Sequence, residues 1–155
     1  MKITTQLRAT AIGIFVFAIA NVAYVYISAS KNDSRVVNYA GIVRGATQRL
    51  VKLEITGNKS DELIANLDKI VNGLIKGDRA LELPPATDKN FLAKMKEVET
   101  NWIKLKQTIE KARQEPKERA ELLQQSEDYF KLANQAVSAA EDFSQGKVQR
   151  LQAIQ

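Results

Sequence analysis

The sequence predicts an all-α protein: an N-terminal transmembrane helix followed by an up-down-up-down antiparallel four-helix bundle. The 22 residues between Arg8 and Lys31 carry no charge and are mostly apolar, enough for one helix to cross a bilayer. Beyond them, apolar residues recur at steps of three and four, as in helices that pack in bundles. Glycine and proline are scarce, with 7 and 3 residues, which disfavours a sandwich or a barrel.

The chain is predicted to have two parts: residues 1–30, a cytoplasmic stub and transmembrane anchor, and residues 31–155, an extracytoplasmic four-helix bundle. Lys2 and Arg8 precede the apolar run. The N-terminus is therefore expected in the cytoplasm and the bundle in the periplasm, held by a single pass through the inner (plasma) membrane. The alternative is a cleaved signal peptide, because residues 18–20, Ala-Ile-Ala, form an acceptable small-x-small site. Both interpretations export the bundle.

Turn and capping signals divide the bundle into four helices. The expected boundaries are a first helix from Val36 to Gly57-Asn58, a second from Ser60 to Gly77, a loop from Asp78 to Pro85, a third from Thr87 or Asp88, and a fourth after Pro116. Their expected inward faces are Val36, Tyr39, Val43, Ala46, Leu50 and Leu53; Leu63, Leu67, Ile70 and Leu74; Phe91, Met95, Val98, Trp102, Leu105 and Ile109; and Leu123, Ser126, Phe130, Ala133, Val137 and Ala140. Trp102 is therefore expected in the core.

Four helices return the chain to the end of the bundle from which it started. A second transmembrane helix is therefore expected next, but the sequence stops at Gln155. We expect a fragment or a truncated gene product. The alternative is a complete protein with a single anchor.

Composition argues against catalysis and cofactor binding. The chain has no cysteine and no histidine, which removes thiolate chemistry, imidazole bases and the commonest zinc ligands. The net charge of +5 comes from basic and acidic residues that are interleaved, so nucleic-acid binding is not indicated. No glycine-rich phosphate loop is present. The prediction is no enzyme, no cofactor and no metal site.

A second row on the first helix is predicted to face another copy of the chain. The row is apolar at both ends and polar in the middle: Val37, Gly41, Arg44, Gln48, Val51 and Ile55. It predicts a homodimer with a two-fold axis near Arg44, where Gly41 would allow close approach. Two Arg44 side chains about 6 Å apart would repel by about 3 kcal/mol at an effective dielectric of about 20, and a small oxyanion or carboxylate between them would remove that cost. The alternative is that Arg44 only snorkels from the seam or pairs with a glutamate.

The segment from Val37 to Arg49 resembles a conserved box in the first periplasmic helix of nitrate/nitrite sensor kinases. It is equally similar to the PilJ-like N-terminal domain of type IV pilus methyl-accepting chemotaxis transducers. That box reads roughly N-x-A-G-x-x-R-M-x-x-x-R, and the matching positions are Asn38, Ala40, Gly41, Arg44 and Arg49. Gln48 agrees with the form found in the transducers. Gly45 stands where the family usually has methionine, which loosens the apolar lining of the site.

The resemblance implies a dimeric four-helix bundle that binds a small anion between protomers. It implies the ligand-binding residues Arg44, Gly41, Gly45 and Gln48, and the supporting residues Asn38, Ala40 and Arg49, with Arg49 aiding helix packing. The expected ligand is nitrate- or nitrite-like, or a carboxylate.

The predicted function is a ligand-sensing extracytoplasmic domain of a membrane-bound signal-transduction receptor. Ligand binding would displace the helices that enter the membrane. The output module, whether kinase, chemotaxis domain or cyclic-dinucleotide enzyme, is absent from these residues. The alternative is a ligand-free, membrane-anchored bundle with a structural or interaction role.

Overall fold

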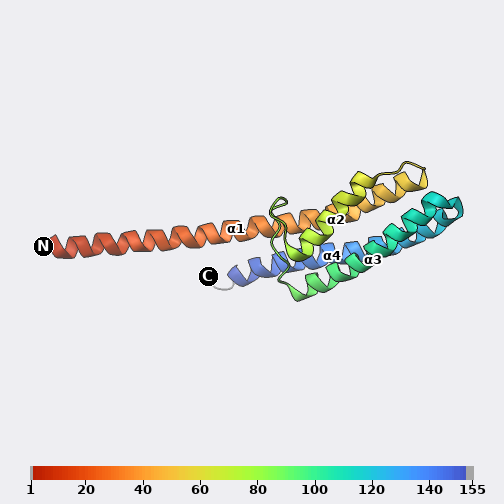
Figure 1. The fold of residues 1–155 in the computed structure, drawn as a ribbon. Helices are drawn as coiled ribbons and strands as arrows, with labels where there is room; N and C mark the ends of the chain where they lie inside the picture. The colour runs from red at the N-terminus through yellow and green to blue at the C-terminus, as the bar shows by residue number, and fades with distance from the viewer. Residues whose placement is uncertain (1, 153–155) are drawn as a thin grey trace. The chain divides into compact units, whose positions relative to one another are not determined.

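A computed structural model describes residues 2–152 and confirms the all-α fold (Figure 1). Its elements, in chain order, are α1 (Lys2–Ile55), α2 (Asp61–Lys76), α3 (Lys89–Gln114), a short 3-10 helix η1 (Pro116–Glu118) and α4 (Arg119–Gln152). Within residues 2–152 there is no strand, and the one isolated β-bridge joins Asp78 to Leu83. The part of the chain that the structure describes is therefore a four-helix protein, as the spacing of apolar residues predicted.

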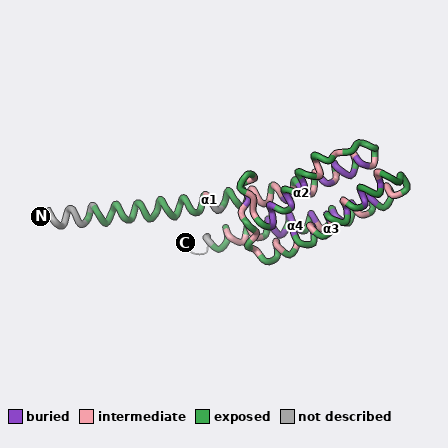
Figure 2. The backbone as a smooth tube through the Cα atoms, in the orientation of Figure 1, coloured by how far each residue is buried: buried purple, intermediate pink, exposed green. Residues whose placement is uncertain are grey.

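The chain separates into two compact units, Met1–Asn32 and Asp33–Gln155. In the first unit, the large apolar residues of α1 from Ile12 to Ile27 are exposed, and Figure 2 colours most of this stretch as exposed. By length and composition this is the one helix among residues 2–152 that is able to cross a membrane. A long apolar helix with no protein around it is what a bilayer would cover.

In the second unit, the predicted inward face of α3 is confirmed. Its six residues, Phe91, Met95, Val98, Trp102, Leu105 and Ile109, are all buried. On α2, Leu67, Ile70 and Leu74 are buried and Leu63 is partly buried against them. The side chain of Asp88 caps α3 by accepting a hydrogen bond of 2.8 Å from the Phe91 amide.

The predicted inward face of α4 was wrong by one residue at two levels. Leu123 and Phe130 are 52% and 37% exposed, whereas Leu122 and Tyr129 are buried. At the second level an aromatic contact explains the choice, because the ring of Tyr129 lies 6.1 Å from that of Trp102 on α3, tilted by 53°. Two large residues stand side by side at each level, so periodicity alone did not distinguish them.

The connection between α2 and α3 is folded onto its own backbone. The amides of Asp78 and Leu83 each donate to the other residue's carbonyl, at 2.9 and 2.8 Å, and the Ala86 amide donates to the Ile75 carbonyl. Gly77 opens this loop with a φ of 83°, and a Cβ there would lie 2.9 Å from the backbone nitrogen of Pro85. Only glycine fits both conditions.

At the other end of the bundle, Arg113 of α3 ties the α1–α2 turn to the core. Its guanidinium donates to both carboxylate oxygens of Glu54, at 2.8 and 2.6 Å, and also pairs with Asp61 and Glu110. Glu54 also accepts a hydrogen bond of 3.1 Å from the backbone amide of Ser60. The predicted cap of α2 therefore stands at Ser60, but its hydroxyl makes no capping bond. Ion pairs between Arg113 and three carboxylates therefore join α1, α2 and α3 at this end of the bundle.

Candidate functional site

Arg44 lies half-buried on α1 and contacts α4. Its Nη1 donates a hydrogen bond of 2.7 Å to the side-chain oxygen of Asn134, and its guanidinium carbon lies 6.0 Å from the centre of the Phe130 ring. A separation of 90 residues joins Arg44 to Asn134, so spacing along the first helix gave no sign of this pairing. Asn134 therefore contacts one edge of the guanidinium, and the Phe130 ring lies over one of its faces.

The positive charge of Arg44 is not compensated within the described chain. None of the ion pairs among the described residues involves Arg44. Two other arginines differ: Arg113 contacts three carboxylates and Arg35 pairs with Glu82. The pairing with a glutamate that the sequence left open is therefore not what the structure has. Arg44 instead binds a neutral amide.

The second row on α1 is not the free face that its pattern suggested. Val51 is buried in the core, and Val37 and Ile55 pack partly against it. Gln48 donates a hydrogen bond of 3.2 Å to the backbone carbonyl of Ser126 on α4. This row flanks α4 of the same protomer, because a helix in a bundle has two neighbours and must bury both flanks.

The exposed face of α1 lies one step further around the helix. Asn38, Ile42, Gly45 and Arg49 follow one another at steps of four, three and four, and all are exposed. Ile42 is an exposed large apolar residue outside both rows that the spacing of the first helix predicts. Ala40, the other supporting residue, is instead buried in the core. We define the outer ridge as Asn38, Ile42, Gly45 and Arg49.

Gly41 and Gly45 are not required by packing within the protomer. A Cβ built at either position would meet no atom within 4 Å. Glycine inside a helix costs about 1 kcal/mol relative to alanine. The space beside both glycines is therefore open to a ligand or to another chain.

Behind Arg44 the bundle core contains a polar layer. Thr47, Ser126 and Tyr129 are fully or almost fully buried. The Thr47 hydroxyl donates to the Val43 carbonyl at 2.8 Å, and the Ser126 hydroxyl to the Leu123 carbonyl at 2.7 Å. The Tyr129 hydroxyl has no hydrogen-bond partner of good geometry among the described residues.

Alkaline pH is expected to destabilise the bundle through Tyr129. Burial raises its pKa above the ordinary value of 10.0, and the Thr47 hydroxyl offsets only part of that rise. The fold therefore favours the protonated phenol, and this contribution is present below pH 10 and is lost as pH rises through the folded value. In an absorbance titration, the ionisation of Tyr129 should appear only as the bundle unfolds. Tyr129→Phe should abolish that late step; if it persists in the variant, another group causes it.

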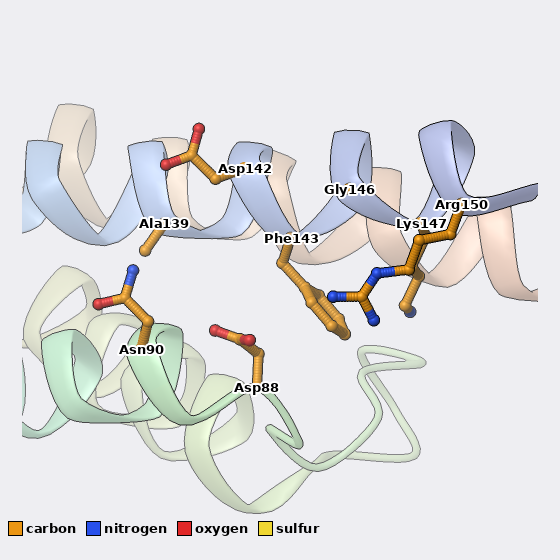
Figure 3. Close-up of a pocket in the computed structure, with 8 residues that line it drawn as sticks. All are labelled: Asp88, Asn90, Ala139, Asp142, Phe143, Gly146, Lys147 and Arg150. Atoms are coloured by element: carbon orange, nitrogen blue, oxygen red, sulfur yellow. The ribbon is translucent and has the colours of Figure 1, made fainter. Parts of the chain in front are cut away.

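A groove of about 270 Å³ lies between the start of α3 and the end of α4 (Figure 3). Its lining residues are Asp88, Asn90, Ala139, Asp142, Phe143, Gly146, Lys147 and Arg150. Lys147 is already engaged, because its ammonium lies 2.8 Å from Asp33 and 4.1 Å from the centre of the Phe143 ring. None of the predicted site residues lines this groove.

Among the described residues no three His, Cys, Asp or Glu side chains are placed to hold a metal ion. The described residues therefore define a class of protein: an all-helical bundle that follows a helix able to cross a membrane.

The comparison with known families gives the particular family. The profile described as "Type IV pili methyl-accepting chemotaxis transducer N-term" matches residues 25–129, more than half of the 155 residues. The chain belongs to this family, whose domains are sensory, non-catalytic parts of membrane chemotaxis receptors. No curated protein and no solved structure matches the chain. The predicted PilJ-like membership is confirmed, while the equal similarity to nitrate/nitrite sensor kinases stays a prediction.

Proposed function

We propose that the bundle senses a small anion, which binds at Arg44 between two copies of the chain. The observation that carries this proposal is the state of Arg44: a guanidinium that α4 holds through a neutral amide, with its charge uncompensated. A planar guanidinium with free N–H groups suits the paired oxygens of nitrate, nitrite or a carboxylate. Gln48, one turn further along the same flank, is the second polar group of the proposed site.

The second copy is proposed to pack against the outer ridge of α1. Ile42 on the outer ridge and Phe130 on α4, which lies near Arg44, are exposed apolar side chains. Gly41 and Gly45 would let two α1 helices approach closely, which explains why the chain accepts their cost within a helix. Asn38 and Arg49, which have no role in the packing of one protomer, would then lie at the dimer contact. The domain boundary near residue 31 and the extracytoplasmic location of the bundle belong to the same proposal.

Anion binding is expected to raise the melting temperature of the wild-type chain and to leave Arg44→Ala unchanged. A ligand that binds only the folded form stabilises it by about 2.7 kcal/mol at about 100 times its Kd. The measurement is thermal unfolding of the full chain in lipid nanodiscs with nitrate, nitrite, chloride, sulfate and acetate. Arg79→Ala is the matched control, because it removes the same charge from an exposed position.

The dimer is tested in the same preparation. Because the chain has no cysteine, Gly45→Cys introduces a single thiol on the outer ridge, and oxidation should link two chains through it. Lys104→Cys, exposed on α3, is the control. If no anion stabilises wild type more than Arg44→Ala, the anion site is refuted, and a ligand-free interaction role becomes the better account of the family's fold here.

A further inference from the structure

We propose that Asn134 of α4 is the positioning residue of the anion site, and that its neutrality is what keeps Arg44 available to a ligand. This inference rests on the proposed function and extends it from α1 to α4. The site would then consist of a charge on one helix and the residue that orients it on another.

The contact geometry supports a positioning role. Arginine has only hydrogen-bond donors, so the group of Asn134 that faces Nη1 at 2.7 Å is its carbonyl oxygen. The Phe130 ring, one turn earlier on α4, lies 6.0 Å from the guanidinium carbon and covers one face. These two contacts restrain the side chain and leave its remaining N–H groups unused by any partner in the described structure.

The side-chain chemistry of Asn134 supports a role in keeping the charge of Arg44 available to an anion. Aspartate has the same shape as asparagine and would make a stronger, charge-assisted bond to Arg44. Two other arginines of this bundle are neutralised in that way, Arg113 by Glu54 and Arg35 by Glu82. An amide at position 134 orients the guanidinium without neutralising it.

The hydrogen bond between Arg44 and Asn134 also connects α4 directly to the residue that is proposed to bind the anion. An anion on Arg44 changes the charge at the atom that Asn134 holds, and α1 and α4 meet at this level through a polar layer. Binding would therefore act on the contact between these two helices rather than on α1 alone.

The test compares Asn134→Asp, Asn134→Leu and Gln135→Glu by titration calorimetry of the full chain in nanodiscs, with nitrate, sulfate and acetate as probes. Asn134→Asp is expected to weaken anion binding at least about tenfold, because the added carboxylate competes for Arg44. Its melting temperature without anion should stay equal to wild type or rise. Asn134→Leu removes the bond without adding charge, so binding should weaken only severalfold. Gln135→Glu adds the same charge at the neighbouring exposed position of α4 and should bind as wild type does.

A purely structural role for Asn134 would lower the melting temperature in both Asn134 variants and leave affinity equal in the two. That result, or wild-type affinity in Asn134→Asp, would overturn the inference. If Arg44→Ala loses binding while Asn134→Asp keeps it, the inference fails and the proposed anion site stands. If Arg44→Ala binds as wild type does, or no probe binds wild type, both fail.

Discussion

Replacing Arg113 with alanine is expected to destabilise the bundle by about 3–5 kcal/mol. The side chain of Glu54 is only 2% exposed, and Arg113 supplies both of its guanidinium hydrogen bonds. Without Arg113, a buried carboxylate would keep only the amide of Ser60 as a partner. An uncompensated buried charge costs far more than an ion pair at the surface.

Urea unfolding followed by the fluorescence of Trp102, the single tryptophan, measures this loss. Lys111→Ala removes an exposed positive charge from the same last turn of α3 and should change stability by less than about 0.5 kcal/mol. The double variant Glu54→Leu with Arg113→Met should recover much of the loss, because apolar residues of similar size often replace a buried pair well. A loss equal to that of Lys111→Ala would show that the pair is not buried in solution.

Trp102→Ala is expected to cost about 3–5 kcal/mol, the range for removing a large buried aromatic residue. The indole is almost fully buried, contacts the ring of Tyr129, and donates a hydrogen bond of 2.7 Å to Asp68 on α2. It therefore joins α3 to two other helices. Removing the indole leaves a cavity and takes away the aromatic contact of Tyr129. The bundle should therefore unfold at a markedly lower urea concentration.

Far-ultraviolet circular dichroism is the measurement for this variant, since it lacks the fluorophore. Trp102→Phe separates the two contributions: it keeps most of the apolar contact but removes the bond to Asp68. Ile103→Ala, at the next and half-exposed position, should have little effect. Equal losses in Trp102→Ala and Ile103→Ala would mean that the core of α3 is not where its spacing places it.

The fold was predictable where one large apolar residue stands at each inward position. Helix α3 has that pattern, and all six of its predicted core residues are buried. On α4 the pairs Leu122–Leu123 and Tyr129–Phe130 offered two candidates at each level. At the second level, contact with Trp102 accompanies the burial of Tyr129. A buried glutamate, Glu54, was not predicted, because its partner stands 59 residues away on another helix.

The candidate site was predictable only in part. Residue type and offset on the first helix pointed to Arg44 and Gly41, whereas Gly45 came from the family resemblance, and all three stay predictions as site residues. The contacts of Arg44 with Phe130 and Asn134 were not predictable, because they depend on how α1 and α4 are aligned lengthwise. Periodicity defines a face of each helix but says nothing about the shift between two helices. For the same reason, the row through Val51 was assigned to a partner chain when α4 covers part of it.

The loop between α2 and α3 has a consequence for how this end of the bundle exchanges with solvent. It is the longest connection among the described helices, yet the amides of Asp78, Leu83 and Ala86 are held by backbone carbonyls, and Glu82 is paired with Arg35 of α1. Amide protons held in this way exchange with deuterium only when the surrounding structure opens, so their exchange rate reports how often that structure opens. Protection in this loop should therefore follow that of the helices beside it, so the length of the connection is no guide to its mobility.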